Sequence, residues 1–405
     1  MRRHKPILPK IYETVVASLS FIYWTHISKG YLKHGKTFIS PPSDKTLTTE
    51  KTGHLLLIGA GVSSLFGLPT SVEIVKSFQL YLKRAISDGK TRKKEIRKIN
   101  SLIKLLKLSR WRLDSESLYS CFQGFSKPKY YAADNNVFTA VMLSKIAQRK
   151  FRLRQSKIAY NLITEYHEYL LSTFYTQAPT VRRNVIKLYG ELFHKITGDA
   201  GWKRRNPKRI ESNIHLFTTN YDNIIELFGD SINQDIVQFY NETINDRITL
   251  NFDNYEHSER GSIFLYKLHG SVDLVQLENG TYLKTEEANE IIESRPDSKV
   301  RSRVLVMGLS KNVVSDPHFE LLSLLKKRFK EQKKCYVIGY SFRDKWISQV
   351  LNDAISSDPG EYEIIYIDRN AVNNVRRNLS EYPNLVKAIK PIKSDAAEYF
   401  GVKLH

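Results

Sequence analysis

The chain has 405 residues, of which 41% are hydrophobic and 26% are charged. This balance excludes disorder of the whole chain, and the length favours either one large domain with an insertion or two domains. Lysine and arginine total 63 against 42 acidic residues, and the net charge of +21 attracts polyanions without indicating which kind. The 2 cysteines are too few for a disulfide framework or a four-cysteine zinc site. We therefore expect a cytosolic protein without zinc or another bound metal.

Residues 1–49 are predicted to form an N-terminal extension that is mainly helical. Its apolar run, residues 15–24, is too short to span a bilayer, and no small-residue cleavage site follows it. We expect neither a membrane span nor a signal peptide. The polar, proline-bearing segment of residues 40–45 separates this extension from the remainder of the chain.

Residues 54–58 form a continuous apolar run that ends in Gly59-Ala60-Gly61. Such a run is typical of a strand that is covered on both faces, as in a parallel sheet. The same signal returns after residue 209. The further candidate strands are residues 214–217, 263–268, 336–338 and 364–367, with 304–307 as an additional candidate. The pattern predicts an α/β fold with a Rossmann-like sheet of about six parallel strands, built from residues 50–70 and 210–405.

Residues 71–209 are predicted to form a large, all-helical insertion in which basic residues are concentrated. Apolar residues recur there at three- and four-residue steps, which is the helical period. The two clearest series are Ile96, Ile99, Ile103 and Leu106, and Ile158, Leu162, Tyr166, Tyr169 and Leu170. Asp114 and Glu116 begin one of the expected helices, where a capping role is favoured over catalysis.

Most of the candidate strands end in a compact polar or glycine cluster. These clusters are residues 218–222, 269–271, 339–341 and 368–370. In an open parallel sheet, ligands bind beyond the carboxyl ends of the strands, so segments far apart in the sequence converge there. The sequence therefore predicts one binding site at this edge.

The order and spacing of these motifs resemble the sirtuin family over residues 53–70 and about 212–370. Gly59-Ala60-Gly61-Val62-Ser63, followed by Gly67-Leu68-Pro69, resembles its phosphate loop; Thr219-Asn220-Tyr221-Asp222 resembles its Gln-Asn-Ile-Asp motif. His269-Gly270-Ser271 and Gly339-Tyr340-Ser341 resemble its catalytic His-Gly and its late Gly-Ser element. The variants Thr-Thr-Asn-Tyr-Asp and Gly-Tyr-Ser-Phe-Arg-Asp look like the effector branch of bacterial antiphage defence, whose members typically hydrolyse NAD. Thr70-Ser71-Val72 replaces the Asp-Phe-Arg of deacylases.

The resemblance implies a sirtuin-like NAD hydrolase that cleaves the nicotinamide–ribose bond, with NAD as substrate. Asn220 would fix the ribose and an attacking water, and His269 would be the general base. The expected NAD-binding residues are Gly59, Ala60, Gly61, Ser63, Thr219, Asp222, Gly339, Ser341 and Asp368. The Asn, Asp and Ser residues among these candidates also have purely structural interpretations, because Asn and Asp form turns and serine caps helices. The resemblance does not distinguish ADP-ribose from cyclic ADP-ribose as the product.

Two alternative functions are open at this stage. The same pocket would suit a protein deacylase or an ADP-ribosyltransferase, and the basic helices would suit a nucleic-acid-binding module with a sirtuin-like fold. An unregulated NAD hydrolase would poison its own cell. We therefore expect a gated enzyme activity that serves abortive infection. The expected partners are further copies of the chain in a homo-oligomer, a HerA-type ATPase or another activating protein, and nucleic acid as a regulator.

Overall fold

The computed structural model describes residues 53–87, 93–108, 114–126, 156–175, 178–198, 210–238, 242–244, 247–249, 261–277, 282–284, 300–305, 318–358 and 360–404. The predicted N-terminal extension lies outside these ranges. Within them, no helix is both long enough and apolar enough to cross a bilayer.

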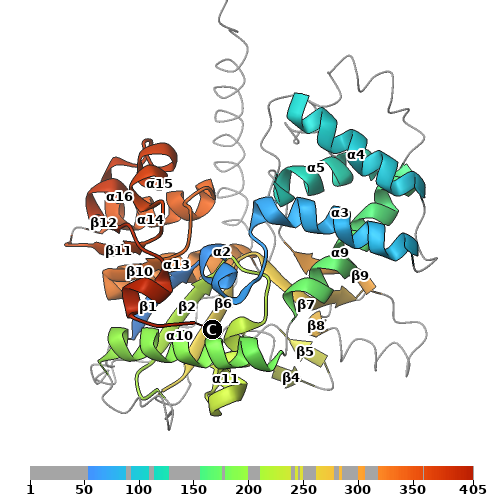
Figure 1. The fold of residues 1–405 in the computed structure, drawn as a ribbon. Coiled ribbons are helices and arrows are strands. Elements are labelled where there is room, and N and C mark those ends of the chain that lie inside the picture. Colours follow the sequence, from blue (N-terminus) through green and yellow to red (C-terminus); the bar gives the residue numbers. More distant parts are fainter. Residues whose placement is uncertain are drawn as a thin grey trace, which may run out of the picture. The chain divides into compact units, whose positions relative to one another are not determined.

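A seven-stranded sheet forms the centre of the fold, with the strand order β12-β11-β10-β1-β2-β6-β3 (Figure 1). All neighbouring strands run parallel, which confirms the predicted α/β fold. The strands are β1 His54–Ile58, β2 Ile214–Thr218, β3 Ile236–Val237, β6 Ile263–Lys267, β10 Lys334–Ile338, β11 Glu363–Ile367 and β12 Ile389–Ile392.

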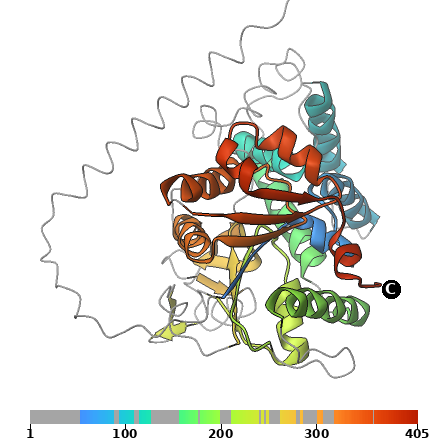
Figure 2. The same cartoon turned by 90° about the vertical axis from the view of Figure 1, so that its left-hand side faces the viewer.

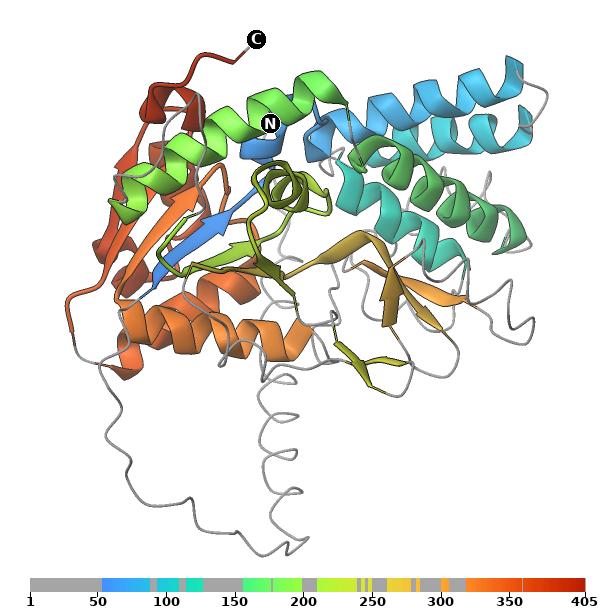
Figure 3. The same cartoon turned by 90° about the horizontal axis from the view of Figure 1, so that it is seen from below.

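Helices cover both faces of this sheet, as the continuous apolar runs require (Figures 2 and 3). In β1, Leu56 and Ile58 belong to one hydrophobic core, and Leu55 and Leu57 belong to the other. The first core is completed by α10 (Pro179–Thr197), α11 (Ile224–Ile232) and α17 (Ala396–Phe400). The second is completed by α13 (His318–Gln332), α14 (Lys345–Ser357), α15 (Ala371–Asn378) and α16 (Pro383–Ala388).

A further group of helices lies beside the sheet, to the right in Figure 1, and its buried apolar side chains continue the first core. It contains α3 (Ser71–Ser87), α4 (Lys93–Leu108), α5 (Ser115–Ser126) and α9 (Ser156–Phe174), and the two predicted periodic series lie in α4 and α9. Aromatic packing joins them, for example between Phe78 and Tyr166, whose ring centroids are 4.9 Å apart. Helix α10 lies within the predicted insertion of residues 71–209, but it packs against α11 and α17 beside the sheet.

Residues 304–307 were an additional candidate for a strand of the parallel sheet, and this prediction was wrong about the sheet to which the strand belongs. Val304 lies in β9 (Val300–Leu305), which pairs antiparallel with β7 (Gly270–Leu277) in a second sheet with β8 (Tyr282–Lys284). An apolar run indicates a strand but does not specify its partner. The short β4 (Glu242–Ile244) and β5 (Arg247–Thr249) pair antiparallel as well.

The connections that follow β1 and β10 touch each other. The Gly61 N–H donates to the Gly339 carbonyl at 2.9 Å. A Cβ at Gly59 would lie 2.6 Å from the Tyr340 Cα, and one at Gly339 would lie 2.6 Å from the Val62 nitrogen. Gly339 also has a φ of +61°, which disfavours any side chain. Glycine is therefore required at this crossing for steric reasons.

The crossing lies at the topological switch point of the sheet. The chain leaves β1 toward β2 and β6 on one side, then returns to β10 on the other side of β1. Parallel α/β sheets bind ligands in the crevice at such a point.

We predict that Gly339→Ala is far more destabilising than Gly198→Ala. Gly198 has a similar φ of +72°, but an added Cβ there would meet nothing within 4 Å. Both variants carry the left-handed backbone cost of about 1–2 kcal/mol. Gly339→Ala adds backbone overlap, worth roughly a further 1–3 kcal/mol. Thermal unfolding measures the difference, and equal losses in the two variants would contradict the crossing described above.

Candidate functional site

A cavity of about 790 Å³ lies at the carboxyl ends of the central strands. This volume lies within the roughly 300–1,000 Å³ that small-molecule sites occupy. Every site residue predicted from the sequence lines the cavity except Gly59. Its wall is formed by the strand ends together with residues of α3, α5, α9, α14 and α15. The predicted convergence of distant loops therefore occurs.

The side chain of Asn220 is buried in the cavity wall. Its Nδ2 donates to the Gly59 carbonyl at 3.2 Å and to Ser63 Oγ at 2.8 Å, and its backbone N–H donates to Thr218 Oγ1 at 3.0 Å. A carbonyl oxygen only accepts, so Gly59 fixes the amide nitrogen on its side. The Asn220 Oδ1 has no hydrogen-bond partner among the described residues. Such an atom requires an explanation, and a bound ligand is one.

Ser63 and Asp222 hold Asn220 in place. Ser63 Oγ accepts from Asn220 and donates to Asp222 Oδ2 at 2.6 Å. Asp222 Oδ1 accepts from the Ile224 N–H at 3.2 Å, at the start of α11. Burial raises the pKa of the Asp222 carboxyl, an effect that the Ser63 hydrogen bond opposes. Asp222 therefore forms an Asx turn before α11 and also supports Asn220 through Ser63.

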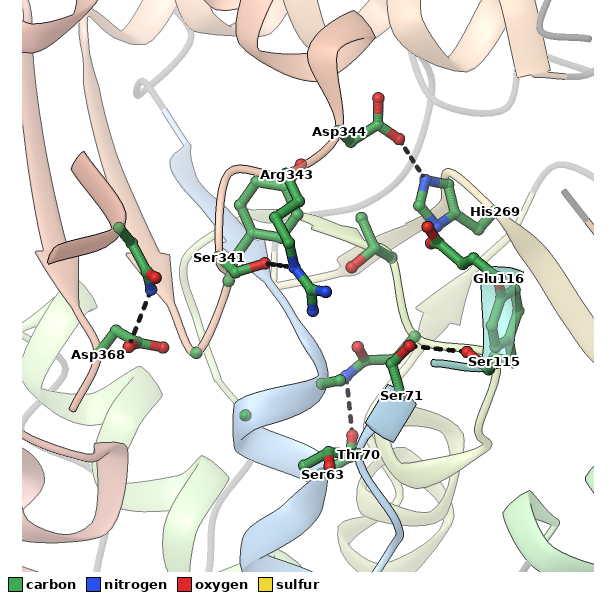
Figure 4. Close-up of a pocket in the computed structure, with 18 of the residues that line it drawn as sticks. Ser63, Thr70, Ser71, Ser115, Glu116, His269, Ser341, Arg343, Asp344 and Asp368 are labelled. Atoms are coloured by element: carbon green, nitrogen blue, oxygen red, sulfur yellow. Dashed lines mark hydrogen bonds and ion pairs between the residues drawn. The ribbon is translucent and has the colours of Figure 1, made fainter. Parts of the chain in front are cut away.

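His269 is paired with the carboxylate of Asp344, which had no predicted role. Its Nε2 lies 2.8 Å from Asp344 Oδ2, and both side chains are buried (Figure 4). The other oxygen of Asp344 accepts from the Trp346 N–H at 2.9 Å and thereby caps α14. One carboxylate thus begins a helix and orients an imidazole. This histidine–carboxylate arrangement is the one found in general bases.

The opposite side of the cavity carries a row of polar side chains from α15 and the residue that precedes it. The row follows the helical repeat, so that its members share one face. They are Asn370, Asn373, Asn374, Arg377 and Asn378.

Asp368, at the end of β11, stands next to this row. Its Oδ1 accepts from the Asn370 N–H at 2.6 Å and from Asn374 Nδ2 at 3.2 Å. Burial raises the pKa of the Asp368 carboxyl above its ordinary value. The sequence predicted Asp368 here but missed the row, although its three- and four-residue spacing is visible in the sequence.

Ser341 and the loop of residues 59–61, both predicted to bind NAD, make hydrogen bonds within the protein. The Gly61 N–H donates to the Gly339 carbonyl. Ser341 Oγ accepts from Arg343 Nε at 2.9 Å, and Arg343 also lies 3.6 Å from Asp114. Cationic side chains nevertheless line the cavity, namely Arg343, Lys345 and Arg377.

The helical group contributes a polar section of the wall. Ser71 and Ser115 share a hydrogen bond of 2.7 Å between α3 and α5, and Glu116 lies near His269 in Figure 4. Asp114 Oδ1 accepts from the Ser117 N–H at 2.9 Å, which confirms the predicted cap of α5. No group of three His, Cys, Asp or Glu side chains within the described ranges is placed to hold a metal ion.

Comparison with known proteins gives one match to a family model. Residues 214–386 match the model of the SIR2-like domain. The match covers fewer than half of the residues, from β2 into α16, and includes Asn220, His269 and Asp344. A SIR2-like domain implies NAD-dependent activity.

A search of curated proteins found no match. Among solved structures, Sir2Tm bound to a propionylated peptide aligns with 12% identity and a TM-score of 0.37 over 86% of this chain and 90% of that chain. A complex of Sir2, a p53 peptide and NAD+ aligns with 12% identity and a TM-score of 0.36 over the same shares, 86% and 90%.

Proposed function

We propose that this protein is an NAD glycohydrolase that cleaves the bond between nicotinamide and ribose. The observation that carries the proposal is Asn220, whose buried Oδ1 has no partner among the described residues and which lines the cavity that also contains the His269–Asp344 pair. An acceptor and an oriented base are what this hydrolysis requires beside the ribose.

The reaction places defined demands on these groups. The C–N bond breaks with its electron pair going to the pyridinium ring, which leaves as neutral nicotinamide, while positive charge develops on the ribose. Asn220 Oδ1 accepts from a ribose hydroxyl or from the attacking water. As the water oxygen bonds to the ribose carbon, His269 accepts the proton and Asp344 stabilises the resulting imidazolium. The products are nicotinamide, ADP-ribose and a proton.

The remaining wall suits the other half of the dinucleotide. Arg343, Lys345 and Arg377 supply positive charge for a pyrophosphate. Asp368 and Asn374 supply hydrogen-bonding groups for the adenosine ribose, the position predicted for Asp368. The Gly59 carbonyl accepts from Asn220 and so positions it. The proposed NAD site is completed by Ala60, Gly61, Ser63, Thr219, Asp222, Gly339 and Ser341.

The biological setting is a further part of the proposal and rests on the resemblance of the sequence motifs. It includes NAD depletion in antiphage defence, activity in the cytosol, assembly into a homo-oligomer, and gating by a HerA-type ATPase, another protein or nucleic acid. Hydrolysis is favoured over deacylation because Thr70-Ser71-Val72 replaces the Asp-Phe-Arg of deacylases.

Asn220→Ala and His269→Ala should each lower the turnover number for nicotinamide release by at least about 100-fold, the lower range for loss of a general base or its equivalent. Chromatography of nicotinamide and ADP-ribose measures this loss. Asn213→Ala is the matched control, because Asn213 Oδ1 accepts from the Gly261 and Ser262 N–H groups and is absent from the cavity wall. Full activity in either site variant would refute the proposed roles.

Asp344→Asn should lower turnover on the order of 100-fold while leaving α14 intact, because asparagine is also a good N-cap. It removes the charge that stabilises protonated His269. Asp395→Asn is the control, since Asp395 caps α17 by accepting from the Glu398 N–H at 2.8 Å and lies outside the cavity wall. Equal turnover in both variants would exclude the His269–Asp344 pair from the mechanism.

A further inference from the structure

Lys267 is an almost fully buried lysine, with 2% of its surface exposed. It is the last residue of β6 and precedes His269 by two positions. Lys267 is absent from the cavity wall, so it is not placed to touch a substrate there. Burying an ammonium is costly unless its protons are hydrogen-bonded and its charge is balanced.

Three contacts surround the Lys267 ammonium. Its Nζ donates to the Asp222 carbonyl at 2.7 Å and to Ser271 Oγ at 2.8 Å, and it lies 2.6 Å from Glu226 Oε1 in α11. Two of the three ammonium protons are thus used in hydrogen bonds, and the Glu226 carboxylate balances the charge.

Two of these contacts connect different loops of the site. Asp222 lies two residues after Asn220, and Ser271 lies two residues after His269. The connection also reaches the Asn220 side chain, because Asp222 accepts from Ser63 and Ser63 accepts from Asn220. One ammonium therefore joins the loop that carries Asn220 to the loop that carries His269.

The ammonium keeps its charge in this environment. Burial lowers the pKa of Lys267, but the nearby carboxylates of Glu226 and Asp273 more than offset this effect and raise it above its ordinary value. Asp273 Oδ1 in turn accepts from Ser271 Oγ. Hydrogen bonds from a charged donor are stronger and more restrictive in geometry than neutral ones.

We propose that Lys267 is a positioning residue, whose ammonium fixes the Asn220 loop and the His269 loop relative to each other. This inference rests on the proposed glycohydrolase function. Misplacement of a reacting group by about 1 Å can lower a rate on the order of 100-fold. A purely apolar contact at the end of β6 would not define the two loop positions in this way.

Lys267→Met tests the role, because methionine has a similar shape and no protons to donate. We expect the turnover number for NAD to fall by about 10- to 100-fold. The Michaelis constant should change by no more than about threefold, since Lys267 does not line the cavity. Initial rates of nicotinamide release across NAD concentrations give both constants.

A second variant separates positioning from folding. Lys267→Met leaves Glu226 without its cation, so thermal stability should fall; Lys267→Met combined with Glu226→Gln removes that unpaired charge and should recover part of it. Turnover should stay low in the double variant. Recovery of turnover together with the melting temperature would overturn the positioning role.

Lys195→Met is the matched control. Lys195 Nζ donates to the Phe400 carbonyl at 2.8 Å, between α10 and α17 and outside the cavity wall. This variant should keep the turnover of the wild type. A loss as large as that of Lys267→Met would overturn the inference, whereas wild-type protein that neither binds nor cleaves NAD would instead contradict the proposed function.

Discussion

The contact between the glycine loop after β1 and Gly339 after β10 is the constraint on which the site depends. It brings the two central strands' connections within hydrogen-bonding distance, at 2.9 Å between the Gly61 nitrogen and the Gly339 oxygen. Because Asn220 Nδ2 donates to the Gly59 carbonyl, the same loop also orients the Asn220 amide. Side chains at these glycines would separate the loops, so their steric role precedes any role in binding.

Much of the fold could be predicted because the central strands are buried on both faces. The predicted apolar runs at residues 54–58, 214–217, 263–268, 336–338 and 364–367 each coincide with a strand of the parallel sheet, and only Leu268 lies beyond its strand. The edge strands were missed for physical reasons: β3 has two residues, and β12 contains Pro391, which has no N–H to donate. Pairing was not predictable for Val304, since partner choice depends on β7, which continues from the end of β6.

The location of the site could be predicted from the ends of the strands, but the contacts between its side chains could not. Asn220, His269 and Asp368 each follow a predicted strand, so topology alone places them at one edge. Asp344 pairs with His269 across a separation of 75 residues. In the sequence, Lys267 is simply one residue of a predicted strand. These contacts depend on side-chain packing. The functions of the predicted residues, and the alternatives of protein deacylation and nucleic-acid binding, stay predictions.

A crystal structure of the His269→Ala variant with saturating NAD tests the central claim most directly, because it needs neither turnover nor an activating partner. We predict intact NAD in the cavity, with a hydroxyl of the nicotinamide ribose or an ordered water about 3 Å from Asn220 Oδ1 and the pyrophosphate near Arg343 or Arg377. NAD bound outside this cavity, or nicotinamide ribose distant from Asn220, would contradict the account.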